Sequence, residues 1–245
     1  SVRGKKLLRC SVKTSTEFAK LNLGNAIMPI LHGFSYSNYY NIPKHALLYK
    51  GVVFSEDLVY ASAEGYNKLS PALKVPSLTT DSGQHLSEAA VLCEYIEDAY
   101  PERPLFPTDT FARNKNRQLM HMAELYLELP NRRLIPYSFS KQPAPEQLIA
   151  EVVAVVERGI NCINALTTFN PWLFGTEFTM ADIYLYYVLT VAEMGGQITG
   201  VDLNKRITGL EEWRTAFAAD PISQGVAADK EANREGFFGY IKSRS

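Results

Sequence analysis

The change in periodicity at residues 101–109 constrains the fold of this chain more than any other feature of its sequence. Before this proline-rich stretch, the apolar residues fall in short runs of strand length, among them "MPILHGF" (28–34), "VVFSEDLVY" (52–60) and "VPSLTT" (75–80). After it they recur with helical spacing, as do Leu119, Met122, Tyr126 and Leu129. We therefore predict an α/β domain over residues 28–100, a linker over 101–109 and an all-helical domain over 110–245.

The α/β region alternates strands with helices. Residues 38–51 are predicted to form a helix that Gly51 ends, and residues 87–100 a second helix that follows a hairpin turn. In the helical region, Thr179 stands three residues before Asp182. This is the spacing of a capping box, and it predicts a buried capping role for Asp182.

Composition excludes several classes of protein. The longest apolar run, residues 183–192, is too short to span a bilayer. The chain has three cysteines, Cys10, Cys93 and Cys162, without a C-x-x-C pair, which favours a reducing compartment such as the cytoplasm. Cys93 and Cys162 lie in apolar helical runs and are interpreted as core residues. The histidines show no metal-ligand spacing, so no metal is expected.

Charge is distributed unevenly along the chain. Residues 1–27 carry a net charge of +5, and the remainder of the chain carries −6. Such an acidic body disfavours binding to nucleic acid. We interpret residues 1–27 as a basic N-terminal extension ahead of the folded part; a basic arm that binds a partner is the alternative.

The stretch "KVPSLTTDSGQHLSEA" (74–89) combines a proline, a strand hairpin and an acidic helix start. Proline has no N–H to donate to a ladder, so it is unfavourable in a strand unless the missing bond serves a purpose. Pro76 therefore predicts main-chain polar groups without ladder partners, close in sequence to a helix that begins near Glu88.

Three motifs together resemble the cytosolic glutathione transferases, in particular their serine-type, bacterial-like members. They are "GFSYSNYYNIPKHALLYKG", "KVPSLTT…HLSEAAVLCEYIEDAYPERPLFP" and "FGTEFTMADIYL", and the resemblance covers residues 28–236. It implies a thioredoxin-like N-terminal domain followed by a helical bundle. It also implies glutathione as co-substrate, a role in detoxification and a homodimer in which the α/β domain of one subunit faces the helical domain of the other.

The resemblance also implies the residues that bind glutathione. Val75, before a cis Pro76, would pair its main chain with the cysteinyl backbone of glutathione, with Lys74 beside it. The Glu88 carboxylate would face the ammonium of the γ-glutamyl end, whose own carboxylate would bind at the helix N-terminus at Ala89. The alternatives are a trans proline that starts an edge strand, and a helix start in which Ser87 is the N-cap and Glu88 only favours the helix dipole.

The sequence departs from the family pattern at two places in this site. Ala89 stands where Ser or Thr usually adds a hydroxyl bond to the carboxylate. Near Ala61 and Ser62, no Lys, Gln or His is present for the glycyl carboxylate. Both departures predict weak glutathione binding.

The catalytic hydroxyl is predicted within "SYSNYYN". Ser37 falls on the position of the catalytic serine, where a hydroxyl donor and a helix N-terminus would both favour the thiolate of glutathione. Tyr36 or Tyr39 is the alternative donor, and a third possibility is that Ser37 only caps the first helix. The loop has no cysteine, which disfavours the cysteine-type members.

The pocket for a small hydrophobic electrophile is expected between the domains. Phe34 and Tyr36 would come from the first loop; Tyr126, Arg133 and Tyr137 would share one face of the first bundle helix. Such a row is also typical of a core, and Arg133 is also expected to pair with a neighbouring carboxylate.

Three functions are compatible with these residues. The first is an enzyme that conjugates the glutathione thiolate to small hydrophobic electrophiles, or uses it in a related isomerisation. The second is a non-catalytic binding or regulatory protein of the same fold, which Ala89 would favour. The third is a glutathione-dependent peroxide or disulfide reductase, which the absent loop cysteine disfavours. We favour the first.

Overall fold

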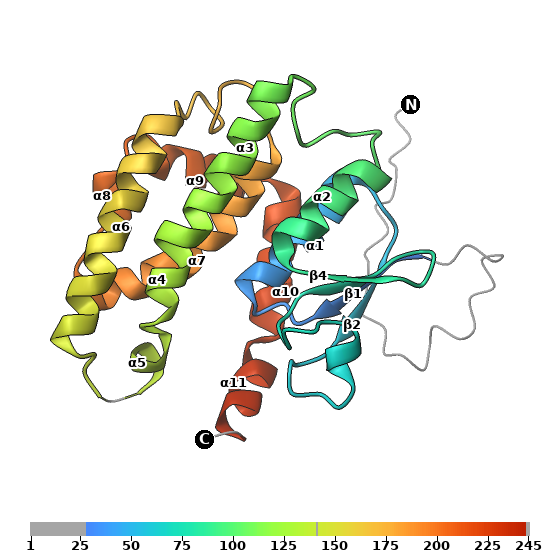
Figure 1. Cartoon of the computed structure of the whole chain (residues 1–245), viewed down its shortest axis with the longest axis horizontal. Helices are drawn as coiled ribbons and strands as arrows, with labels where there is room; N and C mark the ends of the chain where they lie inside the picture. Colours follow the sequence, from blue (N-terminus) through green and yellow to red (C-terminus); the bar gives the residue numbers. More distant parts are fainter. Residues whose placement is uncertain (1–27, 141, 244–245) are drawn as a thin grey trace, which may run out of the picture.

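The computed structural model of the chain describes residues 28–140 and 142–243. The predicted N-terminal extension, residues 1–27, lies outside the described residues. Figure 1 shows a sheet-containing half and a larger helical half side by side, with α1 and α10 at the junction between them. Among the described residues, no helix is long and apolar enough to cross a membrane.

Four short strands form one mixed sheet in the order β2-β1-β3-β4. They are β1 (Ile30–Gly33), β2 (Ser55–Leu58), β3 (Ser77–Thr79) and β4 (His85–Ser87). β2 runs parallel to β1, whereas β3 is antiparallel to both β1 and β4. Leu31 and Leu78 are paired in register and both are fully buried, which places the core of this half against the centre of the sheet.

The predicted helices of this half are present. α1 (Asn38–Lys50) ends at Gly51, whose φ of 72° is the left-handed conformation that glycine adopts without strain. Between β2 and β3 lies the 3-10 turn η2 (Tyr66–Lys68). α2 (Ala89–Ala99) follows β4 and packs against α1.

Residues 101–109 contain no helix or strand, and the second half is helical, as predicted. Its helices are α3 (Thr110–Ala123), the π-helical turn η3 (Glu124–Glu128), α4 (Leu129–Arg132), α5 (Ile135–Phe139), α6 (Glu146–Leu166), α7 (Met180–Thr199), α8 (Leu203–Arg206), α9 (Leu210–Ala219), α10 (Pro221–Ala232) and α11 (Arg234–Lys242). The described part of this half has no β-strand, only an isolated bridge between Trp172 and Gly175.

The capping role predicted for Asp182 is confirmed. Its carboxylate accepts hydrogen bonds from Thr179 N at 2.9 Å, Thr179 Oγ1 at 2.8 Å and Leu173 N at 3.0 Å. It also accepts one from the indole Nε1 of Trp213 at 2.9 Å. These four bonds satisfy a fully buried carboxylate and fix the start of α7, the central helix of the bundle.

Helix α1 joins the two halves through buried polar side chains. Lys44 Nζ lies 2.8 Å from Glu56 Oε2 of β2 and 2.7 Å from Asp229 Oδ2 of α10. The imidazole Nδ1 of His45 lies 3.0 Å from the phenol oxygen of Tyr187 on α7. Lys44 and His45 are buried, and the docking of the two halves supplies Asp229 and Tyr187 as partners for them.

Burial of His45 makes stability depend on pH. Desolvation lowers the pKa of His45 to about 4, against about 6.5 in an unfolded chain. The unfolded state therefore binds more protons than the folded state between these values, so the free energy of unfolding decreases as pH falls from 6.5 to 4. We expect His45 to contribute a loss of about 2 kcal/mol between pH 7 and pH 4.5.

The measurement is urea unfolding of the wild type and of His45→Gln at both pH values. Glutamine keeps a polar partner for Tyr187 but does not titrate, so the variant should lose less stability on acidification by that amount. An equal loss in both proteins would show that His45 is not the titrating group.

Candidate functional site

A cavity of about 400 Å³ lies where the two halves meet, at the N-terminal ends of α1 and α2. From the sheet-containing half its walls are Phe34, Ser37, Tyr39, Ala61, Leu73, Lys74, Val75, Pro76, Glu88 and Ala89. From the helical half they are Glu124, Leu129, Arg132, Phe237, Tyr240 and Ile241. All the residues predicted to bind glutathione are therefore gathered in one cavity.

The peptide bond between Val75 and Pro76 is cis, as predicted. The bond directly precedes β3, in the middle of the sheet order, and Val75 lines the cavity. Within the described part of the chain, neither main-chain polar group of Val75 has a hydrogen-bond partner. These groups can pair with an extended peptide that lies in the cavity.

Glu88 occupies a strained backbone position between β4 and α2. Its φ is +74°, a region that non-glycine residues rarely adopt, and its side chain forms no capping bond. The alternative in which Ser87 is the N-cap is wrong, because Ser87 is the last residue of β4, Glu88 is at the N-cap position and the helix begins at Ala89. The Glu88 carboxylate therefore serves no capping role and lines the cavity instead.

Ser37 caps α1 and lines the same cavity. Its backbone is extended, and its Oγ accepts a hydrogen bond from Tyr40 N at 3.4 Å. The predicted capping role is therefore present, but it uses only a lone pair of the hydroxyl. The O–H of Ser37 stays available to donate to a ligand at the positive end of the helix dipole.

The two alternative tyrosines are placed differently. Tyr39 lines the cavity, but its hydroxyl donates to Glu124 Oε1 at 3.3 Å. Burial, reinforced by the carboxylates of Glu128 and Glu124, holds the pKa of the Tyr39 phenol far above its usual range. Tyr36 is absent from the cavity wall, and its ring stacks on Phe237 with centroids 4.5 Å apart. This geometry favours Ser37 over either phenol as the donor to a ligand.

Three further residues predicted for the electrophile pocket, Tyr126, Arg133 and Tyr137, are also not in the wall of this cavity. The prediction extended one α-helical face from residue 126 to residue 137. Instead, the π turn η3 adds a residue to the turn and changes which side chains face the cavity, and α4 then ends at Arg132 with Arg133 as its C-cap. Arg133 is about half exposed and pairs with Glu151 at 2.9 Å, the alternative that the sequence had suggested.

The neighbouring Arg132 takes the place in the cavity that was predicted for Arg133. Its Nε donates to Glu128 Oε1 at 2.8 Å, and its Nη2 donates to Asn38 Oδ1 at 3.0 Å. Its guanidinium also lies 5.2 Å from the centroid of the Tyr39 ring. Arg132 therefore connects the helical half to the first turn of α1, next to Ser37.

Helix α11 forms a further wall that the sequence analysis did not foresee. The Phe237 ring lies 5.5 Å from the Phe34 ring, and the Tyr240 ring stacks on Tyr60 at 4.1 Å between centroids. The available signal was the cluster of aromatic residues in "REGFFGYIK" (234–242).

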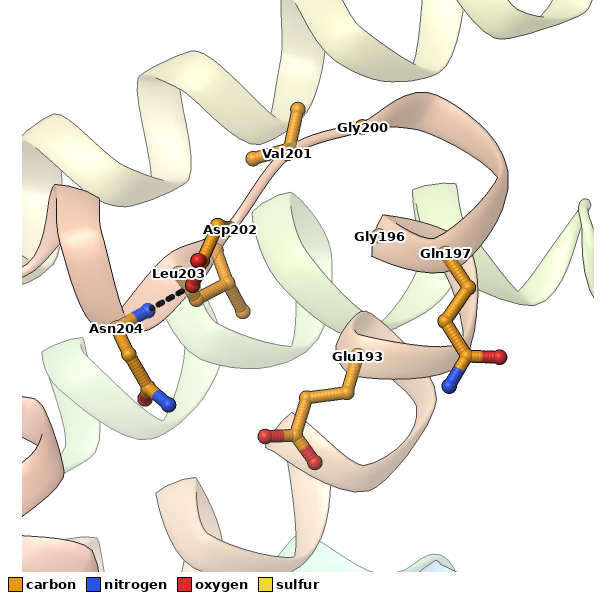
Figure 2. Close-up of a pocket in the computed structure, with 8 residues that line it drawn as sticks. All are labelled: Glu193, Gly196, Gln197, Gly200, Val201, Asp202, Leu203 and Asn204. Carbon is orange, nitrogen blue, oxygen red and sulfur yellow. Dashed lines mark hydrogen bonds between the residues drawn. The ribbon is translucent and has the colours of Figure 1, made fainter.

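A surface hollow, shown in Figure 2, lies on the helical half around the end of α7 and the start of α8. Its carboxylates already have partners: Glu193 pairs with Arg214, and Asp202 caps α8 through Asn204 N. It therefore presents no converging set of reactive groups, and the cavity at Ser37 is the candidate active site.

Comparison with known proteins agrees with this geometry. The model of the glutathione S-transferase N-terminal domain matches residues 31–104, and that of the C-terminal domain matches residues 146–216. A glutathione S-transferase from Pseudomonas putida is 33% identical over 215 residues, which cover 87% of this chain and 97% of the relative. A maleylacetoacetate isomerase from Pseudomonas aeruginosa is 27% identical over 65% of this chain and 76% of that protein.

Solved structures share the fold. A maleyl pyruvate isomerase, described as a bacterial glutathione S-transferase of the Zeta class, superposes with a TM-score of 0.65 at 24% identity over 80% of this chain and 95% of that one. The transferase URE2P8 from Phanerochaete chrysosporium, solved with oxidized glutathione, superposes with a TM-score of 0.73 at 15% identity over 85% and 97%. The chain therefore belongs to the glutathione S-transferase family: it is a glutathione transferase with a thioredoxin-like domain followed by the helical domain of that family.

Proposed function

We propose that this enzyme ionises the thiol of glutathione at Ser37 and transfers the thiolate to small hydrophobic electrophiles. The observation that carries the proposal is the position of Ser37. Its hydroxyl stands at the N-terminus of α1 and lines the cavity that also contains Val75, Glu88 and Ala89.

In this proposal each part of glutathione has a partner in the cavity. The unpaired main chain of Val75 binds the cysteinyl backbone, and the Glu88 carboxylate binds the γ-glutamyl ammonium. The γ-glutamyl carboxylate binds main-chain N–H groups at the start of α2, including that of Ala89. Lys74, which lines the cavity, supplies a cation for the glycyl carboxylate, the role for which no side chain was found near Ala61.

Glutathione binding tests this placement. We expect the wild type to bind glutathione in calorimetry with a dissociation constant at or below the millimolar range. Glu88→Gln, which keeps the shape but removes the charge, should bind about tenfold or more weakly, because a hydrogen bond between charged groups is lost.

Glu94→Gln, a change at a partly exposed residue of α2 outside the cavity that removes the partner of Arg117, is the matched control and should bind as the wild type does. Absence of binding to the wild type at millimolar glutathione would favour the non-catalytic alternative. Equal binding by Glu88→Gln and the wild type would show that the Glu88 carboxylate does not bind glutathione.

Ser37 lowers the pKa of the bound thiol because its O–H and the α1 dipole both stabilise the thiolate more than the neutral thiol. Each unit of lowering requires about 1.4 kcal/mol of such preference. The electrophile would bind in the part of the cavity that is lined by Phe34, Leu129 and the α11 side chains.

Replacement of Ser37 should therefore reduce kcat/KM for an aryl halide by about 100-fold at pH 6.5, the cost typical of losing one preorganised donor to an anion. The loss should shrink at higher pH, where the thiol ionises without help. Ser37→Gly is the variant of choice, because glycine at an N-cap costs helix stability only a few tenths of a kcal/mol.

Ser37→Thr keeps the hydroxyl and should retain most of the activity. A Ser37→Gly enzyme with the wild-type rate and pH profile would contradict the role of Ser37.

A second candidate reaction is glutathione-dependent isomerisation of a carboxylate-bearing alkene. The thiolate would add to the double bond, the charge would move to the conjugated carbonyl, and after rotation the thiolate would leave unchanged. Arg132 favours this reaction, because its guanidinium lines the cavity next to Ser37 and can bind a substrate carboxylate. The similar maleylacetoacetate and maleyl pyruvate isomerases are named for reactions on such substrates.

Maleylpyruvate as substrate tests the role of Arg132. Arg132→Gln alone would leave the buried carboxylate of Glu128 without its partner. The informative comparison is therefore between the double variant Arg132→Gln/Glu128→Gln and Glu128→Gln alone. The double variant should have a KM for maleylpyruvate about tenfold or more above that of the single variant, because the anion loses its charged donor.

Turnover of a neutral aryl halide is the control and should differ little between these two variants. An unchanged KM for maleylpyruvate, or an equal effect on both substrates, would contradict anion binding by Arg132. Activity confined to disulfides or peroxides would favour the reductase alternative. Assembly as a homodimer stays a prediction from the family resemblance.

A further inference from the structure

A second cavity lies at the interface of the two halves, beside the C-terminal part of α1 rather than its N-terminal end. It has a volume of about 380 Å³ and shares no residue with the cavity at Ser37. His45 and Tyr49 contribute from α1, and Trp172 and Phe178 from the segment before α7. His45 lies eight residues beyond Ser37, which corresponds to about 12 Å along a helix axis.

Aromatic rings make up most of the cavity wall. Trp172 and Phe178 are in edge-to-face contact with centroids 4.9 Å apart, and Tyr49 lies 5.2 Å from Phe178. Phe217 lies 5.7 Å from Phe178 and 5.1 Å from the His45 ring. A wall of this kind binds flat apolar molecules by ring contacts and by burial of apolar surface.

The wall contains a buried hydroxyl that has no partner. Ser223 is only 4% exposed, and within the described part of the chain its hydroxyl forms no hydrogen bond. Serine on a helix often donates to the carbonyl four residues before it. Here that carbonyl, Ala219 O, accepts from Gln224 Nε2 at 3.2 Å. A buried hydroxyl without a partner is costly, and a ligand that supplies one would remove the cost.

The charges around the cavity select against ions. Asp220 is the one carboxylate in the wall, and it accepts hydrogen bonds from Ile222 N at 2.8 Å and Ser223 N at 3.2 Å as the cap of α10. The helix N-terminus offsets part of this charge, which weakens the attraction for a cation, and the charge that remains would repel an anion. The low pKa of His45 leaves its imidazole neutral at physiological pH.

We propose that this cavity is a second binding site, and that it takes a small neutral aromatic molecule with one hydroxyl group. The ring fits between Trp172, Phe178 and Phe217, and the hydroxyl pairs with Ser223. The proposal does not depend on glutathione chemistry, because no residue of the first cavity takes part.

The probe is 2-naphthol, compared with naphthalene, which lacks the hydroxyl, and with the anion 2-naphthoate. The chain has two tryptophans, so NMR spectra of the full-length protein should contain two indole N–H signals, which Trp172→Phe assigns. Since Trp172 lines this cavity and neither tryptophan lines the cavity at Ser37, 2-naphthol should shift the Trp172 signal. It should also bind more tightly than either comparison compound.

Two substitutions locate the bound molecule. Ala216 is an exposed residue of α9 that lines the cavity, so Ala216→Phe should block it and weaken binding at least tenfold. Ala218→Phe, on the same helix but facing a different hollow, is the matched control and should bind as the wild type does. Ser223→Ala should bind 2-naphthol about three- to tenfold more weakly and naphthalene unchanged.

Three results would overturn the proposal: a Trp172 signal that does not move at saturating 2-naphthol, wild-type affinity in Ala216→Phe, or equal affinity of the wild type for 2-naphthol and naphthalene. The last result would show that the hydroxyl of the ligand does not contribute to binding. The Trp172 signal of the wild type provides a test that does not depend on the folding of any variant.

Discussion

The burial of α1 on both of its sides is the constraint on which the rest of the structure depends. Ten of its thirteen residues are buried, and three of these, Asn38, Lys44 and His45, carry polar groups that an isolated thioredoxin-like domain would leave without some of their partners. The partners that the helical half supplies are Glu128, Asp229 and Tyr187. An ammonium group taken out of water costs several kcal/mol unless it is paired, so the docking of the halves is part of folding α1.

This docking also assembles the active-site cavity. The groups proposed to bind glutathione, from Val75 to Ala89, all belong to the sheet-containing half, whereas Arg132 and the α11 side chains come from the helical half. In the proposed function, the sheet-containing half would bind the peptide-like co-substrate, and most of the wall for the second substrate would come from the helical half. The strained backbone of Glu88 fits this division, because strain in a residue that serves no capping role is retained where the surrounding structure and a ligand fix it.

The features that could be predicted from the sequence are those that a few neighbouring residues determine. The cis bond before Pro76, the capping alternative for Ser37 and the capping box at Asp182 each depend on a few adjacent residues, and all three are present in the structure. Arg133 was predicted for the pocket, but Arg132 lines the cavity, and the π turn before it is a main-chain irregularity without a composition signal of its own. The wall formed by α11 could not be placed either, because Phe237 meets Phe34 across about 200 residues of chain and only the packed structure brings them together.

The second cavity, which His45 and Tyr49 of α1 line, also depends on how α1 is buried. His45 contacts Tyr187 directly and lies beside the rings of Phe178 and Phe217, and rigid rings do not fill an irregular space as completely as flexible aliphatic chains do. The small residues Ala216 and Ala219 on α9 leave the remaining volume open, and Ser223 lies in its wall without a partner. An unfilled volume and an unpaired hydroxyl both reduce stability, and a valine or alanine at position 223 would remove the second of these costs. A bound molecule that fills the space and pairs with Ser223 would remove both.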